Sequence, residues 1–205
     1  MSKAPQARAF SLAPLIVLAL IAAGDAATAG PTDQLRQYVE RVLGIVHDPA
    51  FQGEAKARER RAAIRRVADR LFDFEEMARR SLGRHWRGRT SAERAEFTEL
   101  FAELLERAYI VRIEEYRGEP ISYRLGAIED DRATVHTTIR TKTGVEVPVD
   151  YRMFHEGARW LVYDVVIEGV SLVANYRTQF DSIIQTSSWE ELIQRMRAKT
   201  SEAAA

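Results

Sequence analysis

The stretch from Trp160 to Phe180 constrains this chain most, because its character changes from strand to helix within a few residues. Residues 160–167 are rich in β-branched and aromatic side chains, which is typical of a strand. After Gly169 the apolar residues recur at helical spacing, at Leu172, Val173, Tyr176, Phe180, Ile183 and Ile184. Glycine tolerates the sharp backbone angle that such a joint needs. The pattern predicts a strand that runs directly into a helix, with a core around both.

The first part of the mature chain is helical in pattern. Apolar spacing predicts a helix over residues 35–46, with Thr32 or Asp33 as its cap and Asp48-Pro49 as its end. Residues 54–66 are crowded with charge, which we interpret as a solvated helix face with pairs four residues apart rather than as a binding patch. The buried stripe of this second helix is Ile64, Val67, Ala68 and Leu71.

Two further helices begin at capping-box spacings. Asp73 with Glu76 starts one, and Thr90 with Glu93 starts the longest helix of the chain. That longest helix carries a wide apolar face, normally a core face, and Gly118 and Pro120 stop it. Gly83 is expected to end the shorter helix.

After Pro120 the pattern changes to short strands with turn residues between them. Four strands are predicted, at residues 121–128, 133–140, 145–154 and 160–167, as an antiparallel meander. Pro148 predicts that the third strand is an edge strand or contains a bulge. Two helices close the chain, at roughly 171–185 and 189–199, and the second begins after Ser188, which stands at capping-box spacing from Glu191. Helices, then a sheet, then helices predict the α+β class.

The first 29 residues have the order of a secretory signal peptide. Lys3 and Arg8 precede a short apolar run from Leu12 to Ala23, and Ala27-Thr28-Ala29 is a small-x-small cleavage site. The run is shorter than the roughly 20 residues of a spanning helix, although an uncleaved anchor is the alternative. We expect cleavage after Ala29 and one domain over residues 30–200, with a helical part (32–117), a sheet (120–168) and C-terminal helices (171–199).

Catalytic and cofactor motifs are missing from the sequence. There is no cysteine, the four histidines are scattered without metal-ligand spacing, and no phosphate-binding glycine loop occurs. Ser171 lacks the second glycine of a nucleophile elbow. Asp150, Asp164 and Glu168 could pair in a cleft, but we favour a structural role in which Asp164 or Glu168 pairs with Arg177 or caps the 171–185 helix. We therefore expect that the protein is not an enzyme and that it binds neither a cofactor nor a metal ion.

Charge argues against nucleic acid as a partner, because Lys+Arg and Asp+Glu both number 30. What is abundant is apolar surface on the longest helix, on the third strand and around Gly169. These faces either meet as a solid core or enclose a cavity. The pattern alone favours solid packing.

Four segments have the form of a family motif, namely Phe72–Arg79 with Leu82-Gly83 and Trp86, Phe97–Leu105 with Tyr109, Val147–Arg152, and Trp160–Phe180. They resemble the MlaC and toluene-tolerance family of periplasmic proteins. The last segment, with Glu168-Gly169-Val170-Ser171-Leu172 and Asn175-Tyr176-Arg177, is long and specific, and the match spans nearly the whole mature chain.

This resemblance implies a periplasmic phospholipid carrier that maintains outer-membrane lipid asymmetry. The carrier would hold acyl chains between a curved sheet and helices. Its partners would be an outer-membrane lipoprotein complex and an inner-membrane ABC transporter with an MCE-domain protein. We expect ten lipid-binding residues, namely Phe101, Leu104, Leu105, Tyr109, Val147, Val149, Tyr151, Val165, Ile167 and Val173. The alternatives are a carrier of hopanoid or another envelope lipid, an envelope interaction domain with a filled core, and an esterase-like enzyme.

Overall fold

A five-stranded antiparallel sheet forms one half of the protein, in a computed structural model that describes residues 29–201. Its strands pair in chain order as β1 (Ile121–Glu129), β2 (Arg132–Arg140), β3 (Glu146–Glu156), β4 (Arg159–Ile167) and β5 (Val170–Ser171). The predicted meander and the α+β class are confirmed, with a short fifth strand in addition. The expected signal peptide lies outside the described residues, apart from Ala29.

Within the described residues, six α-helices cover one face of this sheet or extend beyond its end. They are α1 (Pro31–His47), α2 (Ala57–Leu71), α3 (Phe74–Leu82), α4 (Ser91–Glu114), α5 (Leu172–Thr186) and α6 (Trp189–Ser201). Short 3-10 helices lie between α1 and α2, at Pro49–Phe51 and Glu54–Lys56, and between α3 and α4, at Gly83–Gly88. Within residues 29–201, none of the helices combines the length and the apolar character that a membrane span requires.

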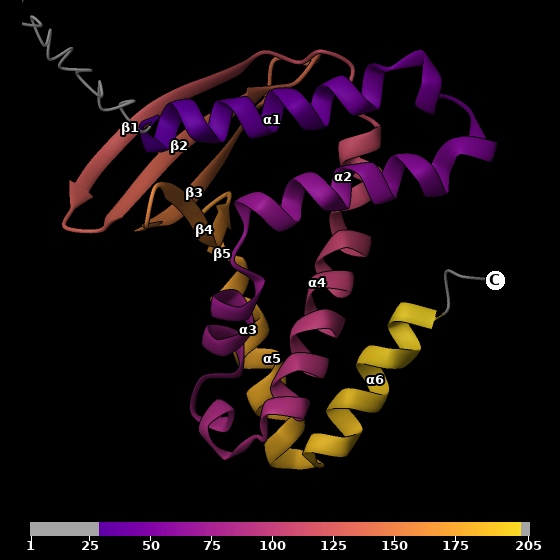
Figure 1. The fold of residues 1–205 in the computed structure, drawn as a ribbon, viewed down its shortest axis with the longest axis vertical. Helices are drawn as coiled ribbons and strands as arrows, with labels where there is room; N and C mark the ends of the chain where they lie inside the picture. The colour runs from indigo at the N-terminus through magenta and orange to yellow at the C-terminus, as the bar shows by residue number, and fades with distance from the viewer. Residues whose placement is uncertain (1–28, 202–205) are drawn as a thin grey trace, which may run out of the picture.

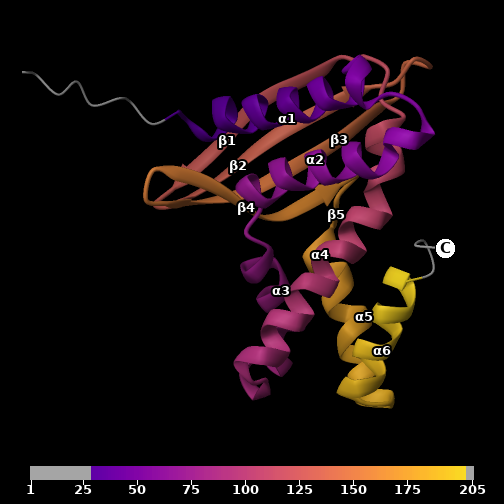
Figure 2. The ribbon, with the colours of Figure 1, turned by 45° about the vertical axis from the view of Figure 1, so that its right-hand side comes forward.

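The helices divide into two groups (Figure 1). Helices α1 and α2 lie across one face of the sheet, whereas α3, α5, α6 and the first half of α4 form a bundle beyond its end. The second half of α4 rises from the bundle toward α1 and α2, as Figure 2 shows from another side. The backbone of Asp73, between α2 and α3, donates to the carbonyl of Val162 at 3.0 Å and so ties both groups to β4.

Helix starts follow the predicted caps in three places. The Asp73 side chain accepts from the backbone N–H of Glu76, and Thr90 and Glu93 form a complete capping box. Ser188 accepts from the N–H of Glu191 before α6. The predicted cap of α1 is wrong, because the helix begins at Pro31 and Gly30 precedes it without a side-chain cap. Proline suits the first helical position, whose N–H needs no partner in the helix.

The prediction for Pro148 is also wrong. Strand β3 lies inside the sheet between β2 and β4, and the register breaks lie elsewhere, at Leu125/Ile128 and at Arg152/Met153. Pro148 is tolerated because it sits near the start of β3, beyond the last registered pair with β4, Val149 with Ile167. There it only accepts, from the N–H of Glu168 at 3.0 Å.

Candidate functional site

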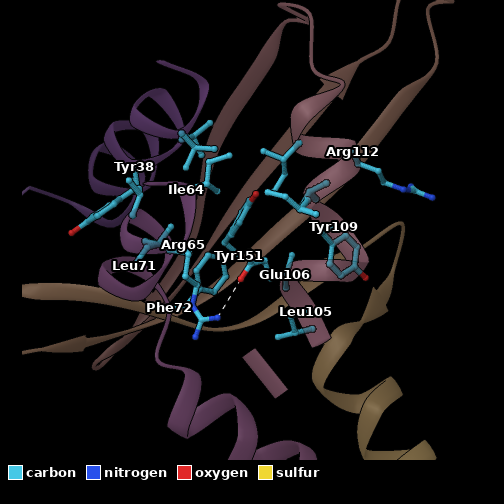
Figure 3. Close-up of a pocket in the computed structure, with 18 of the residues that line it drawn as sticks. Tyr38, Ile64, Arg65, Leu71, Phe72, Leu105, Glu106, Tyr109, Arg112 and Tyr151 are labelled. Carbon is cyan, nitrogen blue, oxygen red and sulfur yellow. Dashed lines mark hydrogen bonds and ion pairs between the residues drawn. The ribbon is translucent and has the colours of Figure 1, made fainter. Parts of the chain in front are cut away.

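An apolar pocket lies between the inner face of the sheet, the α1–α2 pair and the second half of α4 (Figure 3). Its volume is about 370 Å³. This lies within the range of about 300–1,000 Å³ that is usual for small-molecule sites. The apolar stripes of several amphipathic elements converge on it.

The sheet contributes one wall through alternate positions of its strands. Successive side chains of a strand point to opposite faces, so residues two apart share a face. Val149 and Tyr151 of β3 are registered opposite Ile167 and Val165 of β4, and all four line the pocket. Ile121 of β1 and Ile139 of β2 extend this wall.

The helices contribute the other walls at helical spacing. The lining residues are Tyr38, Val39, Val42 and Leu43 of α1; Ile64, Val67, Ala68 and Leu71 of α2; and Ala102, Leu105, Tyr109, Ile110 and Ile113 of α4. Phe72 and Phe74 close the end next to α3. Nearly every side chain that faces the pocket is therefore aliphatic or aromatic.

Three charged side chains also border the pocket, namely Arg65, Glu106 and Arg112. Arg65 of α2 pairs with Glu106 of α4 at 3.3 Å and with Asp69 at 2.7 Å. Burial opposes the charge of Arg65, but the hydrogen bond and the negative charge of Asp69 outweigh burial and raise the arginine pKa above its usual value. In Figure 3 the Arg112 guanidinium extends away from the other lining side chains.

A second set of ion pairs joins α2 to α4. Glu114 lies 2.7 Å from Arg60 and 3.1 Å from Arg61. Burial opposes ionisation of Glu114, but hydrogen bonds from Arg61 and Arg60 hold the carboxyl pKa below its usual value. The solvated-face prediction for residues 54–66 is therefore wrong for Arg60 and Arg61, because their shared partner lies on α4 and spacing along one helix cannot show it. Arg65 has both the predicted kind of pair, with Asp69 four residues on, and a partner on α4.

The ten predicted lipid-binding residues fall into two groups. Six of them line the pocket, namely Leu105, Tyr109, Val149, Tyr151, Val165 and Ile167. The other four, Phe101, Leu104, Val147 and Val173, belong to the hydrophobic core or pack against it without lining the pocket. Phe101 is fully buried and packs against Tyr176 and Phe180 in the helical bundle, with ring centroids 5.3 and 5.8 Å away.

The contribution of α1 and α2 to the pocket was not predicted. Their apolar stripes are visible in the sequence, at Tyr38 to Val46 and at Ile64 to Leu71. An apolar stripe alone does not indicate which part of the protein the helix packs against. Only the tertiary arrangement places both helices over the sheet.

The carboxylates considered for catalysis have structural partners. Asp164 is buried and accepts from the Ser171 hydroxyl at 2.7 Å, the Val173 N–H at 3.1 Å and Arg152 at 3.0 Å. The predicted cap on the helix after Gly169 is confirmed, but the arginine partner is Arg152 and not Arg177.

The other two carboxylates lie apart from any cluster that could bind metal. Asp150 pairs with His136 at 2.9 Å, and Glu168 is exposed in a turn. Among residues 29–201, no three His, Cys, Asp or Glu side chains are grouped so that they could hold a metal ion.

Comparison with known proteins adds three findings. A family model described as MlaC protein matches residues 36–198. The toluene tolerance protein ttg2D of Pseudomonas putida is 22% identical over 173 residues, which cover 83% of this chain and 80% of that protein. A phospholipid-binding protein of Ralstonia solanacearum, solved in complex with a phospholipid, is 24% identical with a TM-score of 0.77, covering 86% of this chain and all of that one. The structural likeness shows a shared fold.

Proposed function

Because the chain belongs to the MlaC family and encloses an apolar pocket, we propose that it binds phospholipid and holds the acyl chains in that pocket. The pocket lining is the observation that carries this proposal. Its walls come mainly from the sheet and from helices α1, α2 and α4, and they are aliphatic or aromatic at nearly every position. The phospholipid in the solved Ralstonia solanacearum relative supports the same ligand class.

The physical basis of binding is burial of hydrocarbon. Each buried methylene contributes about 0.8 kcal/mol, so one long chain offers on the order of 10 kcal/mol before the costs of ordering are subtracted. Affinity can then come from the walls alone. Two of the three charged groups at the border, Arg65 and Glu106, are paired with each other.

We further infer a periplasmic carrier that passes lipid between an outer-membrane lipoprotein complex and an inner-membrane ABC transporter with an MCE-domain protein. The signal-peptide order of residues 1–29 supports export. Family membership supports the carrier role. We propose no enzymatic step, because Asp164 accepts hydrogen bonds from Arg152 and from the backbone at the start of α5.

Export has its own test, which is the mass of the intact protein recovered from the periplasm. We expect the mass of a chain that begins at Gly30. A full-length product in the membrane fraction would contradict cleavage after Ala29.

Lipid extraction tests the binding proposal. The purified protein is extracted with organic solvent, and the extract is analysed by mass spectrometry beside an exported control protein prepared identically. We expect glycerophospholipid at near-stoichiometric amounts from this protein only. A hopanoid in its place would favour the alternative carrier, and no lipid above the control would favour an interaction domain.

A further inference from the structure

Tyr151 places a polar group among the apolar walls of the pocket. It lies in the middle of β3, registered between Val135 of β2 and Val165 of β4, and its side chain lines the pocket. In Figure 3 it stands among the other labelled lining residues, whereas the Tyr38 ring points away from them. Other tyrosines border the pocket, but Tyr151 is the one set into the centre of the sheet wall.

Two hydroxyl groups near the pocket have protein acceptors. Tyr116 donates to the carbonyl of Glu119 at 2.7 Å, and Thr137 donates to the carbonyl of Val149 at 2.7 Å. No described residue forms a hydrogen bond with the Tyr151 hydroxyl. The hydroxyl is not among the fully buried polar atoms that lack a partner, so it is accessible from the pocket and a bound ligand can reach it.

The hydroxyl keeps its proton under all ordinary conditions. Burial, with a small contribution from Tyr123, raises the pKa of Tyr151 to about 12. At neutral pH it is therefore a neutral phenol that offers one O–H donor. Its natural partner is a neutral acceptor, because an anion would have to enter an apolar pocket.

We propose that the Tyr151 hydroxyl donates a hydrogen bond to an oxygen of the bound lipid, so that the pocket selects lipids with an acceptor oxygen within or beside the hydrocarbon. This rests on the proposed function. Two lipid groups supply such an oxygen: the carbonyl of an acyl ester and a hydroxyl on the chain. A site with a buried polar group rejects a ligand that lacks the partner more strongly than an apolar wall rejects a difference in shape.

Lipid competition tests this directly. The purified protein is incubated with vesicles that contain equal amounts of a diester phosphatidylglycerol and its diether analogue with chains of the same length. The bound ratio is read by mass spectrometry. A second mixture compares phosphatidylglycerol with and without 3-hydroxylated acyl chains, so that the two mixtures distinguish the ester carbonyl from the chain hydroxyl.

We expect wild type to favour the oxygen-bearing member of one mixture about five- to tenfold, the upper value corresponding to about 1.4 kcal/mol. Tyr151→Phe removes only the oxygen and should bring that ratio to about one, with an unchanged or higher melting temperature. Tyr163→Phe is the matched control: Tyr163 of β4 does not line the pocket and its ring lies beside Phe154, so this variant should keep the wild-type ratio.

Equal uptake by wild type in both mixtures would overturn the proposal, as would a preference that survives in Tyr151→Phe. In either case lipid still binds, and the proposed function stands. Uptake of no lipid by wild type would overturn both. If Tyr151→Phe does not fold, the wild-type ratios decide alone.

Discussion

Single residues set the geometry of the joint between β4 and α5. Glu168 and Gly169 both have positive φ, at 49° and 82°, so the chain turns through two successive left-handed positions. A side chain is rarely stable in that region, which is why glycine suits the second position. The role predicted for Gly169 from sequence is therefore confirmed, but the turn leads first into the two-residue strand β5 and only then into α5.

Replacing Gly169 by alanine should lower the free energy of unfolding by about 1 kcal/mol, because the left-handed conformation is strained for any side chain. No atom lies within 4 Å of the added methyl group, so the effect is conformational. Gly44→Ala, equally uncrowded but inside α1, should instead raise the free energy of unfolding by about 0.5–1 kcal/mol. Chemical denaturation measures both, and equal signs would contradict this account of the joint.

Asp164 of β4 stabilises the same joint through hydrogen bonds to the residues that follow it. Asp164→Asn should lower the free energy of unfolding by about 1–3 kcal/mol, since hydrogen bonds to Ser171, the Val173 N–H and Arg152 lose their charged acceptor. Glu168→Gln is the control, because Glu168 is exposed. If Asp164→Asn kept full stability but abolished a measurable hydrolytic activity, the enzyme alternative would be favoured instead.

Helix α4 shows how far the sequence could predict the site. Its predicted apolar face is confirmed, but one half of that face packs in the helical bundle and the other half lines the pocket. Phe97 and Phe101 pack against Phe180 in the bundle, whereas Leu105 and Tyr109 face the pocket. Both halves have the same helical spacing, so the sequence could not divide wall from core. Strand positions were more informative, because alternation assigns Val149 and Tyr151 to one face.

Long side chains hold α2 to α4 across the pocket, and Glu114 is the centre of one such contact. Glu114→Gln should lower the free energy of unfolding at pH 7 by about 1–2 kcal/mol, because Arg60 and Arg61 lose a partly buried charged partner. Glu115→Gln, an exposed neighbour, is the control and should have little effect.

The pH dependence follows from the lowered pKa of Glu114. A pKa lower in the folded than in the unfolded state adds stability that is complete above the unfolded-state value of about 4.3. This stability is lost as the pH falls through the folded-state pKa. The difference between wild type and Glu114→Gln should therefore shrink below about pH 4, and a difference that stays constant with pH would contradict this role of the ion pair.

The whole molecule is a sheet and two helices joined to a helical bundle, with the pocket where α4 meets both parts. The sequence predicts the elements and their order, because periodicity and caps are local. It does not predict that α1 and α2 stand off the sheet and leave a pocket. The apolar faces alone favoured solid packing, and only the resemblance to a family pointed to a cavity.

The central claim is that acyl chains occupy the pocket, and one pair of variants tests it most directly. Val149 lines the pocket, whereas Val135 on the neighbouring strand is fully buried and does not line it. A tryptophan at 149 should fill lipid space, so the protein stays folded and the phospholipid bound per protein falls severalfold.

Val135→Trp is the matched control, because overpacking there should cost about 1–3 kcal/mol or more. The measurement is bound phospholipid per protein beside the melting temperature for wild type, Val149→Trp and Val135→Trp. The account predicts lost lipid with retained stability for Val149→Trp only. Wild type without lipid, or Val149→Trp as unstable as Val135→Trp and with unchanged lipid, would contradict it.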